Sequence, residues 1–297
     1  MKGMREIRNR IKAVKSTGQI THAMELVAAA KMRKAQNAAE AGRAYAALLM
    51  DMTQTVMSEI GEAIKLTEDG VKNPKRLIIV FSTDKGLCGA LNANLFKTIA
   101  GIGDGAEFIA VGSRAARFIA RIGKPLKAKF SLSDHVDFYE VRKIAECALK
   151  MMREQGDIGS VEVLYPLFIN TLRQEPTFVK IAPVDDLTEF VERLRKAYKL
   201  DTEARPQDDR RMNFEPTPKE ILRDLPIFYF KQSIYHMALD AKASEHSARM
   251  VAMKNASENA DSLVHKLTLD YNKARQEAIT TEILELAAAA QAMESNP

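Results

Sequence analysis

The sequence predicts a mixed α/β protein in which two long terminal helices form a hairpin that carries a central α/β domain. Residues 227–296 contain no glycine or proline, although the chain has 14 and 10 of these. Residues 4–58 consist mainly of strong helix formers. Between these ends, apolar runs of four to seven residues separated by Gly, Pro, Asn and Asp recur from residue 76 to 184. The predicted boundaries are 1–60, 75–195 and 215–297.

The C-terminal segment is expected to be one unbroken rod. A glycine in a helix interior costs about 1 kcal/mol and a proline about 3 kcal/mol, so excluding both over 70 residues favours continuity. At ~1.5 Å per residue the rod would extend roughly 105 Å, longer than a compact domain requires. Such a helix must bury one side against a partner, and the N-terminal helix is the natural candidate.

The N-terminal helix is basic. Residues 1–36 contain nine Lys or Arg against Glu6 and Glu25, a net charge of +7, whereas the whole chain carries +5. A basic helix fits nucleic acid, an anionic membrane or an acidic protein surface. The alternative, a merely solvated face, normally mixes both signs.

Apolar residues in the two rods have helical spacing and could form a seam. The predicted seam residues are Ile7, Ile11 and Val14 in the first helix and Leu263, Leu267, Tyr271, Ala274 and Ala278 in the second. Further along the first helix, Gly18, Thr21 and 28–30 are small where a two-stranded zipper prefers Leu or Ile. Close or irregular pairing is therefore expected, instead of a regular homodimeric zipper.

The middle of the chain reads as strand, loop and helix units. Predicted strands are Leu77–Phe81, Glu107–Val111, Val161–Leu167 and Phe178–Val184, and predicted helices run through Leu95–Ile99, Arg114–Ile122 and Tyr139–Glu154. This alternation predicts a small sheet of mainly parallel character. Ser133 and Asp134 are expected to cap the last of these helices.

The loop after the first strand, STDKGLCGALN, raises the question of nucleotide binding. It contains neither GxGxxG nor GxxxxGK[ST], so its glycines are better explained by a tight strand-to-helix turn. Cys88 has no identifiable base to activate it. The five histidines do not fall into metal-ligand spacing, so no metal, cofactor or catalytic constellation is predicted.

The composition favours an intracellular protein without a membrane span. No run of 18 apolar residues occurs, and the first residues are charged instead of forming an apolar signal region. Cys88 and Cys147 are far apart and form no CxxC motif, which favours a reducing compartment.

Three long motifs occur in one order along the chain. They are IRNRIKAVKSTGQITHAMELVAAAKMRKAQ from Ile7, STDKGLCGALNANLF from Ser82, and EHSARMVAMKNASENADSLVHKLTLDYNKARQEAITTEILEL from Glu245. Together they closely resemble the gamma-subunit family of bacterial F-type ATP synthases. The resemblance covers nearly the whole chain and is weakest at 61–75 and 185–218.

The resemblance implies a long antiparallel coiled coil of the terminal helices with a central Rossmann-like α/β domain. It also implies a non-catalytic rotor shaft of the central stalk, which couples proton transport through the c-ring to ATP synthesis in the alpha/beta hexamer. The implied partners are the alpha, beta and epsilon subunits and the c-ring, with one copy of this chain per complex and no nucleic acid. The implied location is peripheral, on the cytoplasmic face of the bacterial inner membrane. No chloroplast-type cysteine insertion is present, so no redox switch is expected.

The resemblance also assigns contact residues. Implied beta-subunit contacts are Met24, Arg33, Lys34, Arg275, Gln276 and Thr280. The charge-free C-terminal tip could by composition be frayed or enclosed by other chains, and the resemblance implies enclosure in an apolar bearing that includes Leu286, Ala289 and Met293. Phe214 and Glu215 are the implied c-ring contacts.

Two other classes make different predictions. A DNA-associated coiled-coil protein would bind DNA with a steep salt dependence and would need an ATP-binding motif, which this sequence lacks. A nucleotide-dependent α/β enzyme would bind its ligand around residues 84–89. The sequence leaves the strand order of the sheet, the number of c subunits and the working direction of the rotor open.

Overall fold

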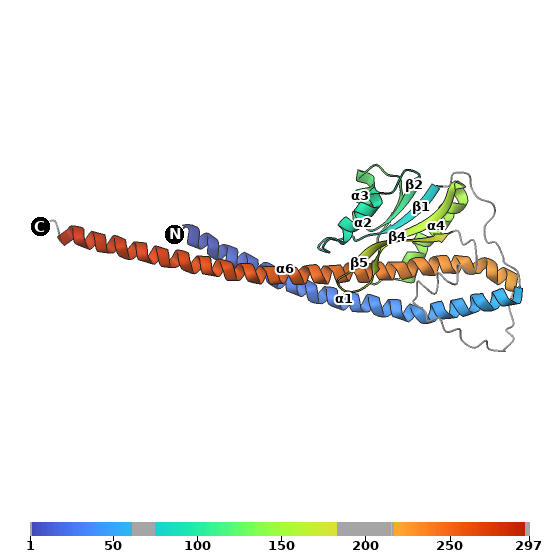
Figure 1. Cartoon of the computed structure of the whole chain (residues 1–297), viewed down its shortest axis with the longest axis horizontal. Coiled ribbons are helices and arrows are strands. Elements are labelled where there is room, and N and C mark those ends of the chain that lie inside the picture. Colours follow the sequence, from blue (N-terminus) through green and yellow to red (C-terminus); the bar gives the residue numbers. More distant parts are fainter. Residues whose placement is uncertain (1, 61–74, 183–214, 216, 295–297) are drawn as a thin grey trace. The chain divides into compact units, whose positions relative to one another are not determined.

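The computed structural model describes residues 2–60, 75–182, 215 and 217–294. It confirms two long terminal helices flanking a central mixed sheet (Figure 1). The elements, in chain order, are α1 (Lys2–Ile60), β1 (Lys75–Phe81), α2 (Leu91–Ala100), β2 (Ala106–Val111), α3 (Ser113–Arg121), β3 (Leu126–Phe130), α4 (Phe138–Gln155), β4 (Ile158–Phe168), β5 (Gln174–Ala182) and α6 (Pro218–Glu294). No helix among the described residues is long and apolar enough to cross a membrane.

The chain divides into two compact units, and both long helices contribute to each. The helix-pair unit comprises Met1–Ala28 and Met250–Pro297, and the sheet unit comprises Ala29–Arg249.

The sheet has the strand order β3-β2-β1-β4-β5. Strands β1 to β4 pair in parallel, and β5 runs antiparallel to β4, which confirms the mainly parallel character expected from the sequence. The order reverses at β1, because the chain moves outward through β2 and β3 and then returns to place β4 on the other side. This is the topological switch point of a Rossmann-like sheet.

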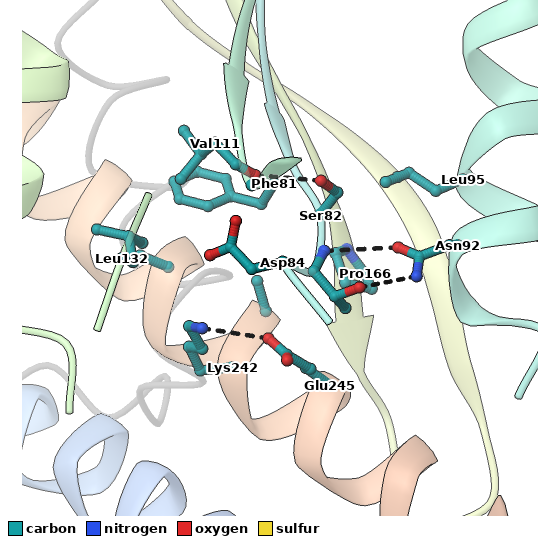
Figure 2. A pocket seen from close by; sticks show the side chains of 14 residues that line it. Phe81, Ser82, Asp84, Asn92, Leu95, Val111, Leu132, Pro166, Lys242 and Glu245 are labelled. Atoms are coloured by element: carbon teal, nitrogen blue, oxygen red, sulfur yellow. Dashed lines mark hydrogen bonds and ion pairs between the residues drawn. The ribbon is translucent and has the colours of Figure 1, made fainter. Parts of the chain in front are cut away.

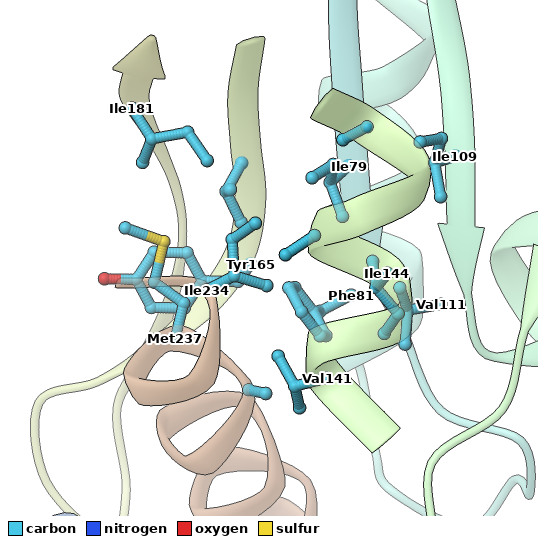
Figure 3. Close-up of a cluster of buried hydrophobic side chains, with 14 of the residues drawn as sticks. Ile79, Phe81, Ile109, Val111, Val141, Ile144, Tyr165, Ile181, Ile234 and Met237 are labelled. Carbon is cyan, nitrogen blue, oxygen red and sulfur yellow. The ribbon is translucent and has the colours of Figure 1, made fainter. Parts of the chain in front are cut away.

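Helices cover both faces of the sheet, and β1 contributes side chains to the hydrophobic core on each face. Leu77, Ile79 and Phe81 point into the cluster formed with α4 and α6 (Figure 3), whereas Ile78 and Val80 point into the cluster formed with α2 and α3. All five side chains are buried, which explains why this strand appears in the sequence as an unbroken apolar run.

The edge strand β3 is not among the strands predicted from the sequence. In this strand Lys127 and Lys129 are exposed and alternate with half-buried Leu126, Ala128 and Phe130. A search for continuous apolar runs cannot find such a strand, although its period of two was available as a signal.

Two helix starts differ from the prediction. The cap of α4 is Asp137, whose side chain accepts a hydrogen bond from the Tyr139 amide, so the expected capping by Ser133 and Asp134 is wrong. Asp134 is instead paired with Lys31 of α1 at 2.5 Å. A cap must immediately precede the first helical residue, and only Asp137 does so.

The C-terminal helix begins at Pro218, nine residues before the glycine- and proline-free rod predicted from residue 227 and inside the predicted 215–297 segment. The Thr217 hydroxyl accepts a hydrogen bond from the Glu220 amide and donates one to the Glu220 carboxylate, which forms an N-terminal cap in front of Pro218. The helix then continues through Pro226. Burial of Leu225 and Tyr229 on either side of that proline provides packing that offsets the lost backbone hydrogen bond.

Candidate functional site

The helix-pair unit contains a regular seam with alternating spacings of four and three. In α1 the less exposed positions that follow this spacing include Ile7, Ile11, Val14, Gly18, Thr21, Glu25 and Ala28. In α6 they include Met253, Ser257, Ala260, Val264, Leu267, Tyr271, Ala274 and Ala278. This is the heptad pattern of a coiled coil.

One seam prediction was wrong by a single residue. Leu263 is 38 % exposed, and Val264 takes its place between Ala260 and Leu267. The predicted steps of four and four from Leu263 to Tyr271 would rotate the stripe away from the partner, whereas alternating steps keep it facing α1.

The two helices approach closely at Gly18, as the small residues there predicted. A Cβ built on this glycine would lie 3.2 Å from the Cβ of Ala260, and the Ser257 hydroxyl donates to the Gly18 carbonyl at 3.4 Å. The two backbones therefore approach at a point where a larger side chain has no room.

The residues predicted to contact the beta subunit fall into three places. Met24 is half-buried in the helix-pair unit, and Arg33 and Lys34 are exposed in the sheet unit. Gln276 and Thr280 are exposed on successive turns of α6, where the Thr280 hydroxyl donates to the Gln276 carbonyl at 2.9 Å. Arg275 is exposed beside them. The hydroxyl oxygen of Thr280 can still accept a hydrogen bond from another chain.

The tip of α6 is a solvent-exposed apolar surface. Figure 1 shows α6 extending past the start of α1 within the helix-pair unit. All residues from 281 to 289 are exposed, and the large apolar ones are Ile283, Leu284 and Leu286 at 60, 64 and 71 %. Ala289 is also exposed, while the side chain of Met293 lies outside the described residues. An exposed apolar patch of this kind is typical of an interaction site.

The two predicted c-ring contacts cannot both be located. Phe214 lies outside the described residues. Glu215 is exposed and lies two residues before Thr217, the cap of α6.

A pocket lies at the carboxyl ends of β1 and β2, which is where ligands bind in many open α/β sheets (Figure 2). Several of its polar groups are already engaged in hydrogen bonds within the sheet unit. Thr83 Oγ1 donates to the Lys85 carbonyl and accepts from the Asn92 amide, while Asp84 accepts from the Ser113 amide at 2.8 Å. These bonds hold the loop between β1 and α2 in shape, which is the turn-forming role favoured by the sequence.

A glycine and a cysteine in this region also have structural explanations. Gly112 has φ +106°, and a Cβ there would lie 2.3 Å from the Ser82 carbonyl oxygen, so only glycine fits. Burial raises the pKa of the Cys88 thiol, which keeps it protonated and poorly nucleophilic. Among the described residues, no group of three His, Cys, Asp or Glu side chains is placed to hold a metal.

A buried charged cluster on α6 was not predicted from the sequence. Glu245 lies between Lys242, at 3.2 Å, and Arg249, at 2.8 Å, and all three side chains are at most 12 % exposed. Arg249 also donates to the Gly86 carbonyl of the β1–α2 loop. The polar run KASEHSAR was visible in the sequence, but polarity in a helix normally indicates a solvated face.

His246 belongs to the same cluster and is 1 % exposed. Burial lowers its pKa to about 4, so the ring is neutral near pH 7. Its Nδ1 lies 3.4 Å from the Arg249 guanidinium. A neutral imidazole beside two buried cations limits the repulsion inside the sheet unit.

Comparisons with known proteins match nearly the whole chain. A family model described as ATP synthase matches residues 3–293. The ATP synthase gamma chain of Opitutus terrae is 48 % identical, with 97 % of this chain and 98 % of that protein covered. The corresponding chain of Akkermansia muciniphila is 37 % identical, with 99 and 100 % covered.

Solved structures share the fold. The rotor of the Euglena gracilis mitochondrial ATP synthase matches with a TM-score of 0.61 at 18 % identity, covering 93 % of this chain and 99 % of that chain. The central stalk and c-ring of the Tetrahymena thermophila mitochondrial enzyme match with a TM-score of 0.57 at 23 % identity, covering 80 and 99 %.

Proposed function

The chain belongs to the ATP synthase gamma-chain family, and from this premise we propose that it is the rotor shaft that transmits torque between the proton-driven c-ring and the catalytic alpha/beta hexamer. The observation that carries the proposal is the match to bacterial gamma chains across 97 % of the sequence. An antiparallel helix pair with an uncovered apolar tip suits a shaft whose end is held by other subunits.

The chemistry takes place in other subunits, and this chain acts mechanically. Its partners are the alpha, beta and epsilon subunits and the c-ring, with one copy per complex. Because a single asymmetric shaft presents a different face to each beta subunit, it favours a different conformation in each of them. This is differential binding of one ligand surface to alternative states.

The basic and polar residues of the shaft contact the beta subunits through weak, exchangeable interactions. Met24, Arg33 and Lys34 face acidic lever loops, and Arg275, Gln276 and Thr280 form a polar catch. Exposed ion pairs contribute only ~0 to 1 kcal/mol each, so successive subunits can exchange them as the shaft turns. Exposure of the polar and basic members of this set supports the proposal.

The two ends of the shaft have different environments. The tip from Leu286 through Ala289 to Met293 turns inside an apolar bearing, which would cover the surface that is exposed in the isolated chain. Phe214 and Glu215 are the proposed contacts with the c-ring. The chain is thereby held peripherally at the cytoplasmic face of the bacterial inner membrane.

Native purification tests the proposal directly. We expect tagged full-length chain to bring down alpha and beta subunits in a 3:3 ratio with one copy of itself. Recovery without these subunits would refute the rotor assignment.

Truncation tests the two contact regions. Removing residues 286–297 should leave the sheet unit folded and weaken assembly or torque, because only the tip is lost. Extending the deletion back through Arg275 should abolish coupling between ATP hydrolysis and proton pumping. Wild-type coupling after the longer deletion would refute the proposed catch.

A further inference from the structure

Helix α3 presents a stripe of three arginines that has no role in the shaft function proposed above. Arg114, Arg117 and Arg121 are all exposed and are spaced by three and four residues, which places them within one narrow sector of the helix. The stripe is about 10 Å long. The opposite side of α3 carries Ala115 and Ile119, which are fully buried against the sheet.

The stripe lacks a counter-charge in the described parts of the chain, where none of the three arginines makes an ion pair. The segment from Lys85 to Ser133 contains eight Lys or Arg against Asp104 and Glu107, a net charge of +6. Glu107 is buried and already pairs with Lys75 and Lys127, so it does not neutralise the stripe. The surface is therefore strongly and locally cationic.

The arginines are held in position by their neighbours. The Arg121 guanidinium carbon lies 5.3 Å from the centre of the Phe118 ring, and Arg117 Nε donates to the Ser113 carbonyl at 3.3 Å. The Arg114 guanidinium lies against Gly86, where an added Cβ would be 3.0 Å from Nη2. Because these arginine side chains are already ordered, they lose less conformational entropy when a partner docks.

The surroundings of the stripe select among anionic partners. Single-stranded nucleic acid would require aromatic rings on which bases stack, but Phe118 is stacked on Phe96 with centroids 4.4 Å apart. A membrane-binding helix would present large apolar residues beside its cations, and on α3 such residues face the core. Planar guanidinium groups bind carboxylates in bidentate geometry.

We propose that the arginine stripe of α3 is a docking surface for an acidic helical segment of another protein, whose carboxylates recur every three or four residues. Such a segment would align its acidic stripe with Arg114, Arg117 and Arg121 over two helical turns. The interaction is electrostatic and does not depend on rotor assembly.

The test measures binding of a fluorescent alanine-based peptide to the isolated full-length chain by anisotropy. The peptide carries Glu at positions i, i+3, i+7 and i+10, and a matched peptide carries Gln at these positions. The chain offers an equivalent control stripe on α1, where Arg5, Arg8 and Lys12 are exposed with the same spacing. Circular dichroism verifies that each variant folds. The stripe is altered in two variants, the charge-reversed R114E/R117E/R121E and the milder, neutral R114Q/R117Q/R121Q.

We expect R114E/R117E/R121E to weaken binding of the Glu peptide at least about tenfold, with a smaller loss for the Gln variant. The equal charge change R5E/R8E/K12E should have less than about a threefold effect, because α3 carries the ordered arginines. Equal loss in both reversed variants, equal binding of the Gln peptide, or binding only to phosphatidylglycerol vesicles or duplex DNA would overturn the proposal.

Discussion

The buried cluster on α6 predicts an asymmetry between two substitutions. Glu245 is the anion between Lys242 and Arg249, with contacts of 3.2 and 2.8 Å. Replacing it by glutamine leaves two buried cations facing a neutral amide, so the free energy of unfolding should fall by about 3 to 5 kcal/mol. Lys242→Met leaves the Glu245–Arg249 pair intact and retains most of the apolar stem, so its cost should stay below about 2 kcal/mol.

Urea unfolding followed by near-UV circular dichroism provides the measurement. The chain contains no tryptophan, so the signal comes largely from tyrosines, and Tyr165 and Tyr229 are buried in the sheet unit. Lys150→Met is the control, because Lys150 and Glu154 pair on the surface at 71 and 65 % exposure, and its expected cost is at most about 0.5 kcal/mol. A loss for Lys242→Met as large as that for Glu245→Gln would refute the bridging role of Glu245.

Three further perturbations test the helix pair and the buried histidine. Gly18→Leu should lower the free energy of unfolding by about 1 to 3 kcal/mol, because the larger side chain clashes in the seam. Gly42→Ala should raise it by about 1 kcal/mol, because a Cβ at this position meets nothing within 4 Å and alanine favours a helix. Thermal melts measure both changes. Val264→Asp should lower the melting temperature of the helix pair and Leu263→Asp should not, and the reverse order would contradict the seam register. The pKa of His246 is about 4 in the folded chain and 6.5 in the unfolded chain, so the unfolded chain binds the proton first as pH falls. The free energy of unfolding should therefore decrease between pH 6.5 and pH 4, by up to roughly 3 kcal/mol. His246→Gln should flatten this part of the plot of unfolding free energy against pH.

The sequence predicted those features that depend on local interactions. Helix propensity and the exclusion of glycine and proline act residue by residue, so α1 and the body of α6 were visible without any tertiary information. Continuous burial of Leu77–Phe81 likewise imposes an apolar run that can be read directly. The error at Leu263 occurred because the seam register depends on alignment with another helix. The edge strand β3 was missed for a different reason, since its alternating pattern is a local signal but not a continuous apolar run.

Only the tertiary structure decided the strand order and the role of the polar residues on α6. Which strand lies next to β1 is set by crossover packing between segments far apart in the chain, and no local pattern records it. A run of polar residues such as Lys242 to Arg249 looks solvated in sequence, because charge burial depends on counter-ions that only the fold brings into reach. Asp134 shows the same limit, since it resembled a helix cap until Lys31 was found 2.5 Å away.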